Sequence, residues 1–121
     1  MKISFDFDST LTREDIQEIA NDFISRGHDV HITTSRSLKS SYRLVGGAEI
    51  KFQNNDLFKV AEDIGIPVEN IHFTEMQDKV SFLNTFDMHF DDDEYEIDLI
   101  TRYNIKCLGV LINYKNYGTN R

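Results

Sequence analysis

The stretch KISFDFDSTLT, which runs from Lys2 to Thr12, decides the fold class of this chain of 121 residues. Its first half, Lys2–Phe7, alternates large apolar side chains with polar ones, and this alternation predicts a β-strand. Thr12-Arg13-Glu14-Asp15 then has the form of a capping box, which predicts that a helix begins here and continues to Ile24. A strand followed directly by an amphipathic helix favours the α/β class.

The rest of the chain continues this alternation of short apolar runs with helical patterns. Further strands are predicted at 29–34, 71–74, 88–90 and 107–112, and further helices near 56–64 and at 79–86 and 95–103. This order predicts parallel strands joined by right-handed crossovers, and therefore a three-layer α/β sandwich. The segment from Ser35 to Asn55 contains Ser and Gly pairs that break any long element, and it is predicted as a loop with a short helix or extended piece.

Composition limits the classes of protein that this chain can belong to. Its length predicts a single domain over residues 1–121. Thirteen Lys and Arg against 21 Asp and Glu give a net charge of −8, which disfavours binding to nucleic acid or a membrane surface by bulk attraction. Cys107 is the single cysteine, so an internal disulfide and a multi-cysteine metal site are excluded. With no membrane span or signal-type apolar run in the sequence, we expect a soluble, cytoplasmic protein.

Polar side chains stand at the ends of the predicted strands. In parallel α/β sheets the ligand binds beyond the carboxyl ends of the strands, so these positions are the first candidates for a site. Lys79 opens the predicted helix that leads into the fourth strand. The strand ends carry Asp6 and Asp8 after the first strand, Thr34 and Ser35 after the second, and Asp91, Asp92 and Asp93 after the fourth.

This set of residue types points to phosphoryl transfer. Crowded carboxylates repel one another unless a cation joins them, and an all-oxygen donor set suits Mg²⁺ rather than zinc. Mg²⁺ keeps several waters and commonly binds a phosphate oxygen, to which Thr34 and Lys79 offer a hydroxyl and an ammonium group. A carboxylate can act as nucleophile, and a second carboxyl two residues away can act as acid and base.

The same residues resemble the motifs of the haloacid dehalogenase-like (HAD) superfamily of aspartate-nucleophile phosphatases. Asp6-Phe7-Asp8-Ser9-Thr10, followed by Leu11, matches the first motif, and Thr34-Ser35-Arg36 resembles the second. Lys79 matches the third motif, and Asp91-Asp92 matches the fourth. The resemblance implies a Rossmann-like, parallel five-stranded sheet in the order 3-2-1-4-5.

Carried over residue by residue, the resemblance assigns roles in catalysis and phosphate binding. It implies that Asp6 is the nucleophile and that Asp8 is the general acid and base. Thr34, Ser35 and Lys79 are expected to bind the phosphoryl group, and Lys79 is also expected to hold Asp6 in place.

The resemblance also implies a metal site. Asp6 and Asp8 are expected to contribute ligands to Mg²⁺, Asp8 through its backbone carbonyl. Asp92 is the expected metal ligand of the acidic run, with Asp91 supporting it. Because Asp93 extends the run to three, the register of these roles stays open at this point.

Members of the superfamily often carry a cap domain, and this chain has no room for one. The segment 37–55 is too short for a cap but long enough for a substrate loop. Arg36, Lys39 and Arg43 make its neighbourhood locally positive and are candidate substrate-binding residues, although ordinary solvent-facing charge explains them equally well.

Each candidate also has an ordinary structural explanation. Asp8 can cap a turn, the run Asp91–Glu94 can be a charged helix N-terminus, and Thr34 and Lys79 can be a strand residue and a solvated charge. The joint placement of these residues at one sheet edge favours the functional interpretation. His31, His72 and His89 lie in separate strands and are interpreted as core or sheet-face residues.

The sequence therefore predicts a Mg²⁺-dependent phosphomonoesterase that forms an aspartyl-phosphate on Asp6. The expected partner is a small phosphorylated substrate, with a nucleoside monophosphate as the first choice. A polynucleotide 3′-phosphatase or other macromolecular phosphatase is one alternative, and a catalytically degenerate phospho-ligand or protein-binding module is another. The oligomeric state, a dimer included, stays open.

Overall fold

The computed structural model describes residues 1–38, 42–45, 48–51 and 54–112, with side chains for 1–38 and 54–112. The strands are β1 (Lys2–Phe5), β2 (Asp29–Thr34), β3 (Tyr42–Val45), β4 (Ala48–Lys51), β5 (Ile71–Phe73), β6 (Met88–Asp91) and β7 (Leu108–Leu111). The helices are α1 (Glu14–Ser25), α2 (Asn55–Ile64) and α3 (Glu94–Arg102), and three short helical turns are η1 (Phe7–Leu11), η2 (Val68–Asn70) and η3 (Lys79–Phe82).

Five strands form one parallel sheet in the order β5-β2-β1-β6-β7. Counted along the chain within this sheet, the order is 3-2-1-4-5, so the predicted fold class is confirmed. The central strand β1 pairs Phe5 with Ile32 of β2 on one side and with Phe90 of β6 on the other. The carboxyl ends of these three strands therefore lie next to one another.

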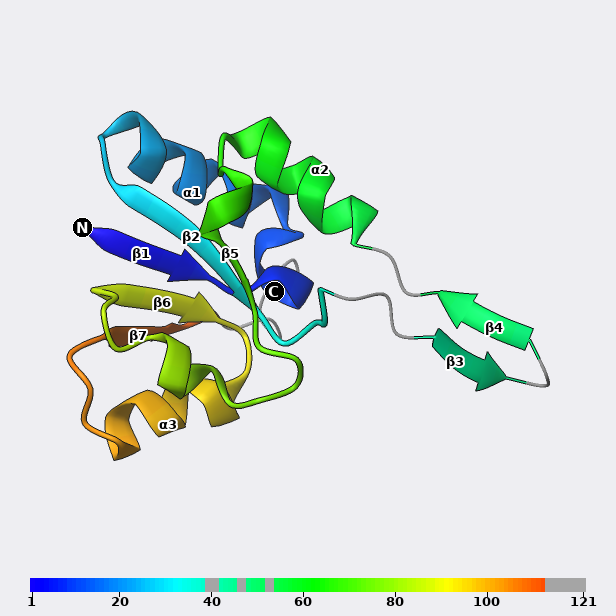
Figure 1. The fold of residues 1–121 in the computed structure, drawn as a ribbon. Coiled ribbons are helices and arrows are strands. Elements are labelled where there is room, and N and C mark those ends of the chain that lie inside the picture. Colours follow the sequence, from blue (N-terminus) through cyan, green and yellow to red (C-terminus); the bar gives the residue numbers. More distant parts are fainter. Residues whose placement is uncertain (39–41, 46–47, 52–53, 113–121) are drawn as a thin grey trace, which may run out of the picture.

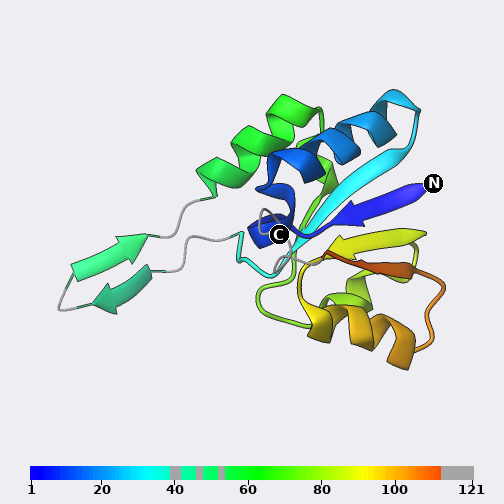
Figure 2. The same cartoon turned by 180° about the vertical axis from the view of Figure 1, so that it is seen from behind.

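Helices cover both faces of this sheet. In Figure 1, α1 and α2 lie on one side of it and α3 with η3 on the other, and Figure 2 shows the same layers from behind. On the α1 and α2 side, Ile3, Phe5 and Ile32 of the sheet pack with Ile16 and Leu57 of the helices in the main apolar core. A smaller apolar cluster lies on the α3 side and consists of Leu83, Phe86, Ile100 and Cys107.

The sheet face toward α3 is polar at its centre. Residues alternate between the two faces along a strand, so Ser4 points away from the side that Ile3 and Phe5 occupy. Ser4 is fully buried and its hydroxyl lies 2.7 Å from that of Thr33. Parallel sheets covered on both faces usually carry apolar runs on both, so a buried polar row at the centre of this sheet is unusual.

Two predicted helix boundaries are wrong. The capping box at Thr12 does not form, because Thr12 closes the turn η1 by donating its backbone N–H to the carbonyl of Phe7. The N-cap of α1 is instead Arg13, whose side chain makes no capping hydrogen bond. The helix predicted at 79–86 is only η3, since the chain must turn back to enter β6, where the N–H of Asp87 donates to the carbonyl of Lys2.

The segment after β2 contains a hairpin. Strands β3 and β4 pair antiparallel, from Tyr42 opposite Lys51 to Val45 opposite Ala48, and they form a sheet of their own. The predicted loop with a short helix or extended piece therefore contains an extended piece, the pair of β3 and β4, whereas a role of 37–55 in substrate binding stays a prediction. The final residue of that range, Asn55, already belongs to α2. Among the helices of the described residues, none combines the length and the apolar character needed to cross a bilayer.

Candidate metal centre

Parallel strand pairing brings two acids together at the carboxyl edge of the sheet. Asp91 ends β6, and Asp6 follows β1, with its backbone N–H donating to the carbonyl of Phe90 at 2.8 Å. A pocket of about 420 Å³ lies at this edge. Its lining consists of Asp6, Asp8, Ser9, Ser35, Lys79, Asp91, Asp92, Asp93 and Glu94.

Lys79 lies between the two acids. Its ammonium Nζ donates to Asp6 Oδ1 and to Asp91 Oδ2, in both cases over 2.8 Å. Its side chain is 4% exposed, and those of Asp6 and Asp91 are 7% and 0% exposed, so this is a buried ion-pair group. The backbone N–H of Lys79 donates to Oε1 of Glu96 at 3.2 Å, which ties the start of η3 to α3.

Asp92 adds a third carboxylate. One carboxylate oxygen from each of Asp6, Asp91 and Asp92 lies within 4.8 Å of the other two. The Thr10 hydroxyl is 3.1 Å from Asp6 Oδ2 and 3.2 Å from Asp92 Oδ1, and its one hydrogen serves one of them at a time. Thr10 was part of the first motif, but the sequence assigned it no role.

The protonation of the cluster follows from burial and from the neighbouring charges. Burial, together with the charge of Asp91, raises the pKa of Asp6 to about 8, although Lys79 works against this. Burial also works to raise the pKa of Asp91, but the hydrogen bond from His89 and the charge of Lys79 outweigh it and lower that pKa. For Lys79, burial is outweighed by the charges of Asp6 and Asp91, so its pKa is raised.

This donor set can hold a metal ion. The cluster brings three carboxylates together, and the ammonium group of Lys79 contacts two of them, Asp6 and Asp91. Lys79 is the only cationic side chain among the described residues that line the pocket. Because all the side-chain donors are carboxylate oxygens, the cluster suits a hard cation that binds oxygen.

Asp93 has a different position from its two neighbours. Its carboxylate caps α3 by accepting the backbone N–H of Tyr95 at 3.0 Å. Its own backbone N–H donates to Asp91 Oδ1 at 3.0 Å. The structure thus places Asp91 and Asp92 in the three-carboxylate cluster and gives the side chain of Asp93 a capping contact.

Asp8 lies at the rim of the pocket in a two-point ion pair with Arg36. Arg36 donates from Nη2 to Asp8 Oδ1 at 2.7 Å and from Nε to Asp8 Oδ2 at 3.0 Å. It also donates to both carboxylate oxygens of Asp56 at the start of α2, at 2.8 and 3.0 Å. The hydrogen bonds with Asp56 and Asp8 raise the pKa of Arg36. The guanidinium carbon is 4.9 Å from the centre of the Phe7 ring.

The remaining predicted site residues differ in how close they come to the pocket. Ser35 lines it, whereas Thr34 is fully buried below and accepts the backbone N–H of Arg36 on its hydroxyl at 3.2 Å. Lys39 and the side chain of Arg43 lie outside the described residues.

Sequence reasoning missed the role of His89 at this site. His89 is fully buried on β6, and its Nε2 lies 2.8 Å from Asp91 Oδ2. Burial lowers the pKa of His89 even though Asp91 acts in the opposite direction. The available signal was its spacing, because His89 and Asp91 are two residues apart on one strand and therefore share a face.

Comparison with known proteins leaves the family of the chain open. No protein-family model matches the chain, and no curated protein matches it in sequence. The fold and the acidic cluster therefore rest on the chain's own sequence and structure.

Proposed function

We propose that this chain is a Mg²⁺-dependent phosphomonoesterase of the HAD type, with Asp6 as the nucleophile. The observation that carries the proposal is the contact of Asp6 with Lys79, 2.8 Å apart in a pocket that also holds Asp91 and Asp92. Without a metal the pKa of Asp6 is about 8, and a bound cation would favour its ionised form. An ionised carboxylate that is fixed by an ammonium group beside such a cation is suited to attack an electrophilic phosphorus atom.

The reaction has two steps. An oxygen of Asp6 attacks phosphorus, and the bond to the leaving-group oxygen breaks. Asp8, which must first take up a proton in place of one of its contacts with Arg36, gives that proton to the leaving-group oxygen. Water then attacks phosphorus, Asp8 takes up a proton from this water, and the bond between Asp6 and phosphorus breaks. Inorganic phosphate leaves and both carboxyl groups return to their starting states.

The metal site and the phosphate site overlap in this proposal. Asp6, Asp91 and Asp92 are the side chains that would hold Mg²⁺. The resemblance to the superfamily adds the backbone carbonyl of Asp8 as a further ligand. When bound, Mg²⁺ supplies the positive charge that lets a phosphate dianion enter a pocket lined by acids. Lys79 provides a second cation, and Ser35 offers a hydroxyl at the wall of the pocket.

The size of the pocket supports a small substrate. A volume of about 420 Å³ suits a small phosphorylated molecule whose phosphate group reaches Asp6. A nucleoside monophosphate is the first choice, on the resemblance of Asp91-Asp92 to small deoxyribonucleotide phosphatases of the superfamily.

The proposal is tested with p-nitrophenyl phosphate, followed by nucleoside monophosphates, sugar phosphates and a 3′-phosphorylated oligonucleotide. We expect Mg²⁺-dependent release of phosphate by the wild type and none by Asp6→Asn, which keeps the shape of the side chain but removes the nucleophile. Highest turnover on the oligonucleotide, with a steep salt dependence, would instead identify a polynucleotide 3′-phosphatase. Mg²⁺ binding without turnover of any ester would refute the phosphatase and leave a binding module.

A further inference from the structure

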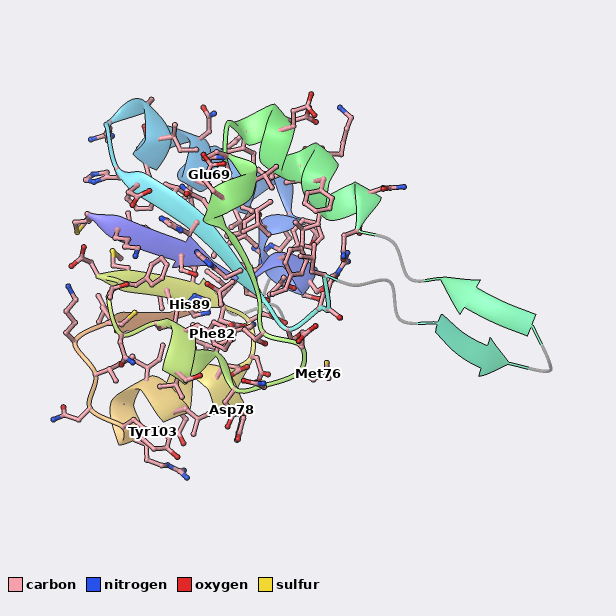
Figure 3. The ribbon with its side chains drawn as sticks, in the orientation of Figure 1. Glu69, Met76, Asp78, Phe82, His89 and Tyr103 are labelled. Carbon is pink, nitrogen blue, oxygen red and sulfur yellow. The ribbon has the colours of Figure 1, made fainter. Side chains whose placement is uncertain are left out.

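A chain of buried polar groups crosses the three central strands and ends at the acidic cluster. Thr33 on β2, Ser4 on β1 and His89 on β6 are all fully buried. The hydroxyls of Thr33 and Ser4 are 2.7 Å apart, and Ser4 Oγ is 2.9 Å from His89 Nδ1. His89 Nε2 is 2.8 Å from Asp91 Oδ2. Figure 3 shows His89 within the sheet layer, whereas the labelled Met76 and Tyr103 lie at the periphery.

The directions of these hydrogen bonds are fixed from the Asp91 end. Asp91 Oδ2 already accepts a hydrogen bond from Lys79, and an ionised carboxylate only accepts, so His89 Nε2 must carry the hydrogen. A neutral imidazole has one N–H, which leaves Nδ1 as an acceptor for the Ser4 hydroxyl. The Ser4 oxygen is then free to accept from Thr33. Every hydrogen therefore points toward Asp91.

Asp91 is held at three points as a result. Lys79 and His89 both donate to Oδ2, and the backbone N–H of Asp93 donates to Oδ1. A carboxylate has about four acceptor positions, so one stays available at the pocket wall. Metal-binding carboxylates depend on such outer hydrogen bonds to keep their orientation.

We propose that His89 is a positioning residue of the metal centre: as the Nε2–H form, selected by Ser4 and Thr33, it fixes the carboxylate of Asp91. This inference rests on the proposed function for its link to catalysis, but its link to metal binding can be measured separately. His89 acts through Asp91, since it does not belong to the described lining of the pocket.

Two amide substitutions separate the hydrogen bond from the bulk of the side chain. In His89→Gln the terminal amide nitrogen reaches the place of Nε2 and can still donate to Asp91. In His89→Asn the shorter amide reaches only the place of Nδ1, on the Ser4 side. Both variants place one neutral amide group at this fully buried position, so the cost of burying a polar group is similar in the two.

The first readout is the Mg²⁺ dissociation constant of the full chain, measured by calorimetry without any substrate. We expect it to rise about tenfold or more in His89→Asn and to stay within about threefold of wild type in His89→Gln. The second readout is nitrogen NMR of the wild type, in which Nε2 of His89 should carry the hydrogen and Nδ1 should not. Turnover of p-nitrophenyl phosphate should follow the same order as the Mg²⁺ affinities.

Several results would overturn this inference. They are equal Mg²⁺ affinities in the two variants, a hydrogen on Nδ1, or a wild type that does not bind Mg²⁺ at all. If His89→Asn does not fold, Ser4→Ala is measured in its place. Loss of the Ser4 hydroxyl should mix the two imidazole forms in the NMR spectrum and weaken Mg²⁺ binding. An unchanged spectrum and an unchanged affinity would refute the inference. A wild type that binds Mg²⁺ but hydrolyses no ester refutes the phosphatase alone, because the affinities still decide the role of His89.

Discussion

The ammonium group of Lys79 lies 2.8 Å from the carboxylate of Asp6, and both side chains are buried. Lys79 comes from η3 and Asp6 from the end of β1, so this contact joins segments 73 residues apart in the sequence. The same ammonium also reaches Asp91, which makes Lys79 the shared counter-ion of two acids that would otherwise repel each other.

Replacing Lys79 should therefore destabilise the protein. In Lys79→Met the acids lose their shared cation while the length of the side chain is kept, and removal of one partner of a buried ion pair costs about 3–5 kcal/mol. We expect the free energy of unfolding, measured with urea, to fall by this order in the absence of Mg²⁺. Added Mg²⁺ should recover more stability in the variant than in the wild type, since it replaces the missing positive charge.

The matched control is Lys59→Met. Lys59 forms an exposed ion pair with Asp63 on α2, and its side chain is 72% exposed. Its loss should leave both the stability and the Mg²⁺ response unchanged, because exposed pairs are screened by water. Equal losses in the two variants would contradict the role assigned to Lys79.

The sequence predicted the fold well because hydrophobic periodicity reports which side chains a sheet buries. The strand ends, and with them Asp6 and Asp91, followed from that pattern and from the parallel order of the strands. The boundaries of η3 and α1 could not be predicted from this pattern. The end of η3 depends on a backbone hydrogen bond to a residue remote in the sequence, and the start of α1 depends on one within the preceding turn. The sequence shows that Ser4 alternates with Ile3 and Phe5. That Ser4 is nevertheless buried follows only from the structure, in which both faces of β1 are covered.

The acidic run after β6 yields a second prediction, on metal binding. Asp92→Ala should weaken Mg²⁺ binding about tenfold or more, because it removes one of three clustered carboxylates. Asp93→Ala should leave the affinity close to wild type, since its contact with Asp91 comes from the backbone. Loss of the α3 cap should instead lower the free energy of unfolding by about 1 kcal/mol.

Calorimetric Mg²⁺ titrations and urea unfolding of both variants check this assignment. If Asp93→Ala loses the metal and Asp92→Ala keeps it, the register inferred from the cluster is wrong.

The ion pair of Arg36 with Asp8 supports a third prediction, on turnover. Arg36→Gln removes the two-point contact that orients Asp8, and misplacement of a proton-transfer group slows the reaction. We expect kcat/KM for p-nitrophenyl phosphate to fall about tenfold, with the loss mainly in kcat. Arg102→Gln is the matched control, because Arg102 pairs with Asp98 on the far helix α3. Faster turnover in Arg36→Gln would show that Arg36 restrains Asp8 rather than positioning it.

Arg36 also shows where sequence reasoning about a site stops. Its place after the second strand, next to a short insertion, suggested a contact with substrate. In the structure its donors are taken by Asp8 and Asp56, which are 48 residues apart in the sequence and meet only through the fold. Charge and position along the chain predict that an arginine lies near a site, whereas its partners depend on tertiary packing.

A fourth prediction concerns acid stability and comes from His72. Its Nε2 lies 2.8 Å from Nδ1 of His31, and burial together with the charge of His31 lowers the pKa of His72. The unfolded chain takes up this proton near pH 6.5, whereas the native protein takes it up only at lower pH. The contribution of His72 is therefore complete above about pH 6.5 and is lost as the pH falls through the native pKa.

Urea unfolding at neutral pH and at about pH 5 measures this loss. His72→Gln keeps a polar side chain without the proton uptake, so its stability should fall less on acidification than that of the wild type. Equal losses would contradict the shifted titration of His72.

The fifth prediction concerns Cys107, which lies in the small apolar cluster beside α3 and is 5% exposed. Burial and the charge of Asp87 raise the pKa of the Cys107 thiol to about 11, with Lys106 acting in the opposite direction. At about pH 8 the thiolate fraction in the native protein should then be roughly a hundredfold below that of an ordinary thiol. The reaction with a chromogenic disulfide reagent should be slow in native buffer and fast in urea.

The same shift predicts a decline of stability at alkaline pH. The unfolded thiol releases its proton at a lower pH than the native one, so the unfolded state gains stability as the pH rises from about 9 toward 11. Cys107→Ala lacks this titration and should lose less stability over that range, even though the missing sulfur lowers its stability at neutral pH. Parallel pH profiles for the two proteins, together with rapid labelling of the native thiol, would show that Cys107 is accessible and that the α3 face of the sheet opens readily.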